Sequence, residues 1–205
     1  KTVNTGLKAL LNYCDLPNRE IRAKDIAWNI APIINSAGRM GDAKIAVDLF
    51  TTDDFRKAND ISNLLIELNL KRKEKGEKNL NIIKPIVENK YYKDPVIILS
   101  TDKAEHGVTG IIASKIAREF VKPAIIIVND GKIGIGSGRG SKRFDLVSLI
   151  SRCSDLLVKF GGHRSAVGFT IDTENIDLFR NRINNMVENE YTKCENQSVL
   201  EIDEV

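Results

Sequence analysis

The stretch from 131 to 143 reads GKIGIGSGRGSKR, with glycine at every second position from 134 to 140. Side chains alternate between the two faces of a β-strand, so a strand over 132–140 places these glycines on one face. A face without side chains lets another backbone or a ligand approach closely. The pattern therefore predicts either a ligand-binding strand or a glycine-rich edge strand that binds nothing, and this stretch alone leaves both open.

The other face of the expected strand carries Ser137 and Arg139, about 6.5–7 Å apart along the chain. Arginine donates a planar fork of N–H groups and serine adds a neutral donor, so the pair suits a phosphate. Known nucleotide loops do not fit. The P-loop pattern GxxxxGK[ST] is absent, and GxGxxG would need glycine at 139 or 141, where Arg139 and Ser141 stand.

The surrounding sequence alternates strand and helix signals. Short apolar strands are expected at 95–100, 123–130, 132–140 and 166–172, and helices at 108–120, 145–152 and 172–190. Such alternation predicts a small α/β domain with a mixed sheet over residues 91–205.

The first half of the chain is expected to be helical. Apolar residues recur at three- and four-residue spacing in 2–13, 22–35 and 41–52. A long helix follows over 53–90, with Asp53 or Asp54 as its N-cap, a charged middle, and Pro85, which is expected to bend or break its later turns. We therefore expect a helical segment at 1–52, a connector helix at 53–90 and the α/β domain at 91–205.

Composition limits the class of protein. The chain has 205 residues, and no apolar run approaches the roughly 18–20 residues that span a bilayer, which argues against a membrane protein. Three cysteines, far apart in sequence, suggest neither a disulfide framework nor a zinc site and favour a reducing cytoplasm. From Lys132 to Arg164 there are seven basic and two acidic residues. This local excess is what a polyanion site needs, and a solvated basic face is the alternative.

Two further motifs carry candidate residues. In KFGGHRSAVGF, Gly161 and Gly162 are expected to form a flexible turn before His163, where backbone N–H groups and the imidazole can hold a phosphate; a structural histidine is the alternative. In NSAGRMGD, Arg39 is expected in a turn between helices, either as a surface residue or as a phosphate contact. Two histidines without clustered acids predict no metal site.

Together these motifs resemble the RecJ-type single-strand-specific exonucleases of the DHH phosphoesterase superfamily. The segment APIINSAGRMGDAKIAVDLFTTDD resembles the APRxNAAGRxGD segment that follows the family's catalytic domain. In order and spacing, GVTGIIASKI, GSGRG followed by FDL, and KFGGHRSAVGFTI resemble its DHH-associated C-terminal domain. The resemblance covers nearly the whole chain, and the AGR segment favours RecJ over other DHH phosphoesterases.

The resemblance implies a 5′→3′ exonuclease that acts on single-stranded DNA with a 5′ end, in DNA repair and recombination in the cytoplasm. In the family, Mn²⁺ or Mg²⁺ is held by an N-terminal domain with a DHH triplet, which this sequence lacks. The resemblance implies that the chain starts just after the last metal-binding motif and ends where an OB-like domain would begin. Those two domains are its implied partners, and the chain alone is expected to be inactive.

The family's site residues transfer by motif. Ser137 and Arg139 correspond to its SGR motif, which receives the 5′-terminal phosphate, and Arg39 corresponds to the AGR arginine near the scissile phosphate. The GGH loop, which contacts the substrate backbone, corresponds to Gly161, Gly162 and His163.

The sequence departs from the family at several positions. Gly140 replaces the second serine of SGRS, and Arg164 and Ser165 replace small and apolar residues after GGH. Glu105 stands at the histidine of WHxGV with His106 beside it, so we assign His106 no role. Two alternatives stay open: a superfamily enzyme for very short oligonucleotides or cyclic dinucleotides, and a non-catalytic nucleic-acid-binding module whose glycines serve only packing.

Overall fold

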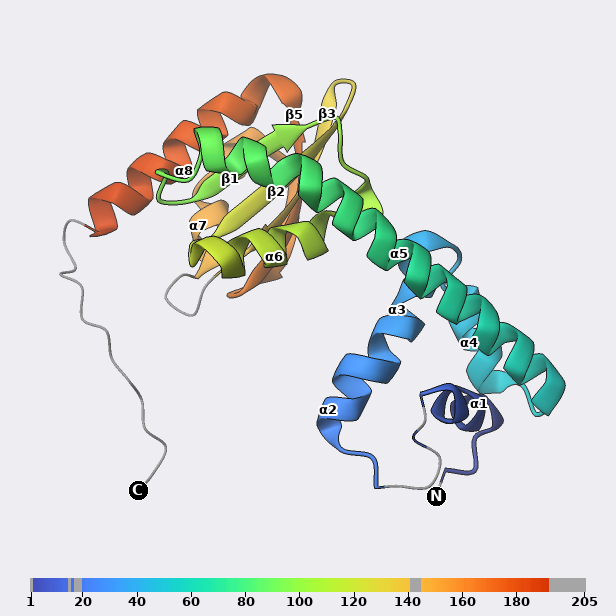
Figure 1. Cartoon of the computed structure of the whole chain (residues 1–205). Helices are drawn as coiled ribbons and strands as arrows, with labels where there is room; N and C mark the ends of the chain where they lie inside the picture. The colour runs from blue at the N-terminus through green and yellow to red at the C-terminus, as the bar shows by residue number, and fades with distance from the viewer. Residues whose placement is uncertain (1, 15, 17–19, 141–144, 192–205) are drawn as a thin grey trace, which may run out of the picture. The chain divides into compact units, whose positions relative to one another are not determined.

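The computed structural model describes residues 2–14, 16, 20–140 and 145–191 (Figure 1). The chain divides into two compact units, Lys1–Leu80 and Asn81–Val205. Each unit has an apolar core of its own. Among the described residues, no helix combines the length and the apolar character that a membrane span requires.

The N-terminal unit is helical, as predicted. Its elements are α1 (Thr5–Tyr13), α2 (Ala23–Asp25), the π-helical turn η1 (Ile26–Ile30), α3 (Ala31–Met40), α4 (Lys44–Thr51) and the first part of α5 (Phe55–Lys90). The N-cap predicted for the long helix is confirmed, because the Asp54 carboxylate accepts the backbone N–H of Arg56 at 2.8 Å.

The core of this unit forms where α3 and α4 pack on α5. Leu49 and Leu65 are fully buried there. The buried Ser36 hydroxyl donates to the carbonyl oxygen of Leu65 at 3.0 Å, which fixes α3 against α5. One turn further along, a Cβ on Gly41 would lie 3.4 Å from Leu68 Cδ1. The end of α3 is therefore held close to α5.

Two local predictions about these helices are wrong. Arg39 lies in the last turn of α3 and not in an interhelical turn, because the small residues of the AGR motif continue the helix until Gly41 donates its N–H to Ala37 at 2.9 Å. A break at Pro85, one of the two outcomes expected there, is wrong, because α5 runs continuously from Phe55 to Lys90. Burial of Ile83 and Val87 on either side of Pro85 offsets the loss of one backbone hydrogen bond.

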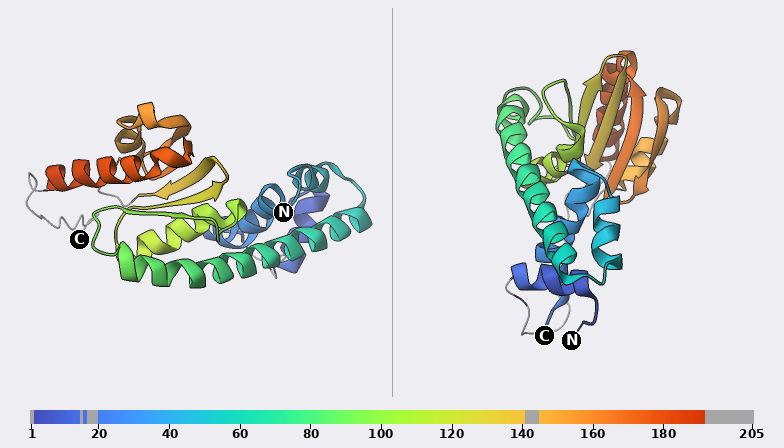
Figure 2. Two further views of the ribbon diagram at one scale, coloured as in Figure 1. Left: turned by 90° about the horizontal axis from the view of Figure 1, so that it is seen from above. Right: turned by 90° about the vertical axis from the view of Figure 1, so that its right-hand side faces the viewer.

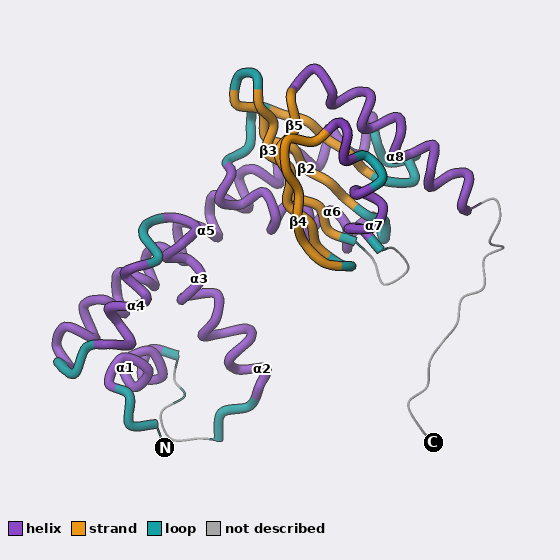
Figure 3. The backbone as a smooth tube through the Cα atoms, turned by 180° about the vertical axis from the view of Figure 1, so that it is seen from behind, coloured by secondary structure: helices purple, strands orange, loops and turns teal. Residues whose placement is uncertain are grey.

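The C-terminal unit contains a mixed five-stranded sheet in the order β1-β2-β3-β5-β4 (Figure 3), which confirms the predicted α/β class. Strands β1 and β2 are parallel and the other neighbours are antiparallel. The strands are β1 (Ile97–Thr101), β2 (Ala124–Asp130), β3 (Ile133–Arg139), β4 (Leu157–His163) and β5 (Ala166–Asp172).

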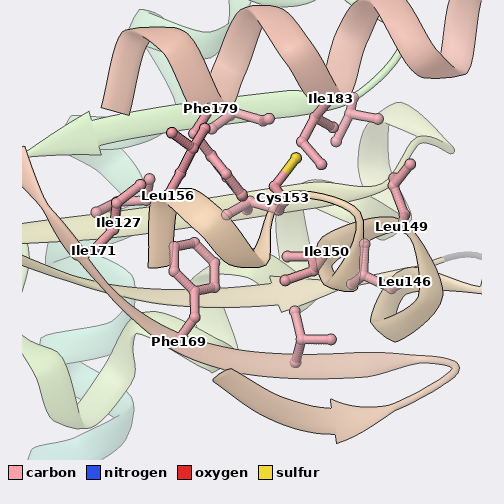
Figure 4. Close-up of a cluster of buried hydrophobic side chains, with 14 of the residues drawn as sticks. Ile127, Leu146, Leu149, Ile150, Cys153, Leu156, Phe169, Ile171, Phe179 and Ile183 are labelled. Atoms are coloured by element: carbon pink, nitrogen blue, oxygen red, sulfur yellow. The ribbon is translucent and has the colours of Figure 1, made fainter. Parts of the chain in front are cut away.

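Helices cover the two faces of the sheet unequally. Helix α6 (Thr109–Phe120) packs over β2 and β3 on one face, while α7 (Leu146–Ser151) and α8 (Ile176–Tyr191) lie on the other (Figure 2). The second face holds the main core, built around Phe169, Phe179 and the buried Cys153 (Figure 4). Short 3₁₀ turns complete the unit: η2 (His106–Val108), η3 (Ser154–Leu156) and η4 (Thr173–Asn175).

Strand β4 was not predicted. The expected turn at Gly161–Gly162 is wrong, because both glycines lie inside β4 and the hairpin to β5 turns at Arg164 and Ser165. Gly162 has a φ of +152°, and a Cβ there would collide with the carbonyl oxygen of Ala166. The second glycine is therefore needed for close pairing of the two strands, and not for a turn.

Candidate functional site

The alternating glycines of β3 face the core of the C-terminal unit. A Cβ on Gly134 would lie 2.8 Å from Ile127 Cγ2, and one on Gly138 would lie 2.8 Å from Val167 Cγ2. A Cβ on Gly136 would fall on the ring of Phe169, a residue of the core shown in Figure 4. Core side chains therefore fill the glycine face, so of the two interpretations left open for this strand, the one in which a ligand approaches its glycine face is wrong.

The opposite face of β3 brings Ser137 and Arg139 together. Arg139 Nη1 donates to Ser137 Oγ at 3.2 Å and to the Gly138 carbonyl oxygen at 2.7 Å. Both residues are half-buried. Because the serine oxygen accepts from the guanidinium, its own O–H is directed elsewhere and can donate to a third group.

The first turn of α6 lies against this pair. A Cβ on Gly110 would lie 2.6 Å from Arg139 Nη2 and 3.0 Å from Ser137 Oγ, so only glycine fits without displacing them. The Thr109 hydroxyl donates to the carbonyl oxygens of Glu105 and His106, both at 3.1 Å, and fixes the start of the helix. The Thr109 N–H donates to the carbonyl oxygen of His106 in the preceding 3₁₀ turn, and the start of the helix carries partial positive charge. We call Gly110, Ser137 and Arg139 the anion corner.

Strand register extends this face from the anion corner toward the sheet edge. Ser137 pairs with Gly168 across β5, and Gly168 pairs with Gly161 across β4. A Cβ on Gly161 would meet nothing within 4 Å, and one on Gly168 would meet only the Gly136 carbonyl oxygen at 4.0 Å. We call Gly161, Gly168 and Ala166 the bare strip. Here the missing side chains leave open surface, unlike the glycines of β3.

Polar side chains border the bare strip. His163 pairs with Ala166, which pairs with Arg139, so one row across the sheet holds both the imidazole and the guanidinium. His163 is exposed, and its Nδ1 accepts the backbone N–H of Ser165 at 3.3 Å. That bond makes Nε2 the nitrogen that carries the proton of a neutral ring. The exposed Lys159 lies on the same strand, two residues before Gly161.

The structure thus divides the predicted site residues into three groups. Ser137, Arg139, Gly161 and His163 share one face of β3, β5 and β4. Gly162 pairs with Val167 of the core and faces the other side. Arg39 is an exposed residue of the N-terminal unit. The sequence alone did not single out Gly110 and Gly168. A single glycine in a helical or strand pattern does not indicate which residues of other elements lie against it.

The described residues hold no group of three or more His, Cys, Asp or Glu side chains placed to bind a metal ion. This part of the chain therefore does not fit Mn²⁺ or Mg²⁺, which need several oxygen ligands.

Substituting Gly110 with alanine is expected to weaken anion binding without destabilising the fold. The new methyl group must push the flexible end of Arg139 away, while alanine favours the helix by about 1 kcal/mol over glycine. We expect about threefold weaker binding of a 5′-phosphorylated oligonucleotide, with the midpoint of thermal unfolding unchanged or raised. Fluorescence anisotropy and circular dichroism measure the two effects. A lower unfolding midpoint with unchanged binding would contradict this description of the anion corner.

Comparison with known proteins finds matches over both units of the chain. The DHHA1 domain model matches residues 93–189, which include all five strands of the sheet. The anion corner and the bare strip both lie within the residues that this model matches.

Similarity to RecJ extends beyond the DHHA1 domain. The chain is 31% identical to the single-stranded-DNA-specific exonuclease RecJ of Bacillus subtilis (strain 168), over 99% of its own length and 26% of the relative's. Crystal structures of RecJ from Thermus thermophilus with Mg²⁺ and with Mn²⁺ match 92% of the chain at 28% identity, with TM-scores of 0.81 and 0.82, respectively. The matched region covers 29% of the first RecJ chain and 28% of the second. The resemblance seen in the motifs is confirmed, and the chain spans about a quarter of the length of these relatives.

Proposed function

We propose that this chain is the substrate-holding part of a 5′→3′ exonuclease specific for single-stranded DNA, in which Ser137 and Arg139 bind the 5′-terminal phosphate. The observation that carries the proposal is the anion corner, where a guanidinium, a hydroxyl and a helix start meet. Similarity to RecJ over 99% of the chain supports the choice of substrate.

The anion corner suits a terminal phosphate better than an internal one. A phosphate monoester carries a charge near −2 and three acceptor oxygens, whereas an internal phosphodiester carries a single negative charge. Arg139 and Ser137 supply donors, and the positive end of α6 at Gly110 lies against them. Fixing the 5′ end in this way sets which phosphodiester reaches the reacting groups of the intact enzyme, so hydrolysis removes terminal nucleotides.

The nucleotides that follow the 5′ end would lie on the bare strip. Without Cβ atoms at Gly161 and Gly168, a sugar-phosphate backbone can approach the strands closely. His163 Nε2 and Lys159 border the strip and would donate to phosphate oxygens. Metal ions bound elsewhere in the intact enzyme would activate the attacking water. The residues of this chain hold and orient the strand.

A size series at Gly168 tests this placement. Serine and then valine at Gly168 should weaken binding of a single-stranded oligonucleotide progressively, to about tenfold for valine, because the added atoms rise into the strip. Stability should hold or increase, since the position is open and β-branched residues favour strands. Anisotropy titrations with a 5′-hydroxyl oligonucleotide and urea denaturation measure the two effects. Equal affinity for the oligonucleotide across the series would mean that the nucleotides do not lie on the bare strip.

A further inference from the structure

Arg72 on α5 is held in a fixed orientation. Its Nε and Nη2 donate to Asn69 Oδ1 at 3.2 and 2.9 Å. Asn69 is only 7% exposed, so the accepting oxygen is itself anchored in the N-terminal unit. One edge of the guanidinium is thus occupied, and the Nη1 group is left to bind another acceptor.

The end of helix α3 carries a second arginine near this one. Ser36 is bonded to Leu65, and Gly41 lies against Leu68, so the turn of α3 that carries Arg39 lies along the part of α5 that leads to Arg72. Burial lowers the pKa of Arg72, and the charge of Arg39 lowers it further, as expected for neighbouring cations.

No carboxylate compensates these charges in the described part of the chain. The ion pairs found there involve other residues, and neither Arg39 nor Arg72 takes part in one. Two guanidinium groups held near each other repel, and part of that repulsion is relieved when an anion binds between them. Arginine forks match the oxygens of a phosphate.

The resemblance already implies a phosphate contact for Arg39, and we propose that Arg72, with Asn69 as its positioning residue, joins Arg39 in a two-arginine site for an internal phosphodiester group of a single strand. The site deepens the proposed function and rests on it for the identity of the strand. The anion corner is expected to prefer a terminal phosphate. The two-arginine site has no helix start beside it, so it is expected to bind internal and terminal phosphates equally well.

The test uses the full chain and a single-stranded oligonucleotide with a 5′-hydroxyl and a 3′ fluorophore. Arg72→Gln is expected to weaken binding about tenfold and to reduce the slope of log affinity against log salt by about 0.7, the loss of one phosphate contact on a single strand. Arg72→Lys keeps the positive charge but not the planar fork of N–H groups, and its affinity for the oligonucleotide should be about threefold lower than that of the unaltered chain. The matched control is Lys73→Gln, which removes one charge from the next, exposed position of α5 and should change affinity less than about twofold.

Asn69 is tested through its coupling to Arg72. Asn69→Ala should weaken binding about threefold in the unaltered chain and not at all in the Arg72→Gln background. A purely structural asparagine would give the same loss in both backgrounds and would lower the midpoint of thermal unfolding.

The outcomes separate this site from the anion corner. If Arg72→Gln behaves like Lys73→Gln, or if the unaltered chain binds no oligonucleotide, the two-arginine site is wrong. If Arg72→Gln weakens binding while Arg139→Ala leaves any preference for a 5′-phosphate unchanged, the two-arginine site stands and the proposed end clamp fails. If Arg139→Ala removes that preference and Arg72→Gln has no effect, the end clamp stands and the two-arginine site fails.

Discussion

Replacing Arg139 with alanine is expected to remove the preference of this chain for a 5′-phosphorylated over a 5′-hydroxyl single strand. Hydrogen bonds to a charged group contribute about 1.5–3 kcal/mol, so the affinity for the phosphorylated strand should fall roughly 10- to 100-fold. Binding of the 5′-hydroxyl strand should change far less, because it offers no terminal phosphate. Anisotropy titrations of both strands give the ratio directly.

Two variants control for charge alone. Lys132→Ala removes a positive charge just before the first residue of β3 and should leave the preference intact. Arg139→Lys retains the charge but not the fork that reaches Ser137, and should keep only part of the preference. If Lys132→Ala and Arg139→Ala have equal effects, the basic surface binds as a whole and the anion corner has no special role.

Substituting Gly136 with alanine is expected to lower the free energy of unfolding of the C-terminal unit by about 3 kcal/mol. The new methyl group would fall on the Phe169 ring, which is buried and lies 5.1 Å, centre to centre, from the ring of Phe179. The ring cannot leave without opening the core. Urea denaturation followed by circular dichroism measures the change.

Gly161→Ala is the matched control. It makes the same chemical change in a neighbouring part of the sheet, where nothing lies within 4 Å of the new Cβ. We expect its free energy of unfolding to stay within about 0.5 kcal/mol of that of the unaltered chain. Similar losses in both variants would mean that the glycines of β3 are not packing positions.

The sequence predicted the faces of β3 but not what covers them. A period of two is a property of the strand itself, so it correctly placed Ser137 and Arg139 together. Which face is buried depends on Phe169 and Val167, which come from another strand and reach β3 only in the folded sheet. The sequence left open an alternative in which the glycines of β3 serve only packing, and this is correct for the face on which these glycines lie. It does not bear on the opposite face, which carries Ser137.

The same reason explains the other errors. Gly161 and Gly162 have the composition of a turn, and only pairing with β5 makes them strand residues. Pro85 would break an isolated helix, and packing of its neighbours in the core keeps α5 continuous. Gly110 and Gly168 adjoin Ser137 and Arg139 through contacts between elements, which no local pattern encodes.

The most direct test of the end clamp is the set of backbone amide shifts in ¹⁵N-labelled chain titrated with a 5′-phosphorylated trinucleotide and with its 5′-hydroxyl counterpart. We predict that only the phosphorylated ligand shifts the amides of Gly110, Ser137 and Arg139, while both ligands shift those of Gly161 and Gly168. Shifts from the phosphorylated ligand that leave Gly110, Ser137 and Arg139 unchanged would contradict the end clamp, because the terminal phosphate would then bind outside the anion corner.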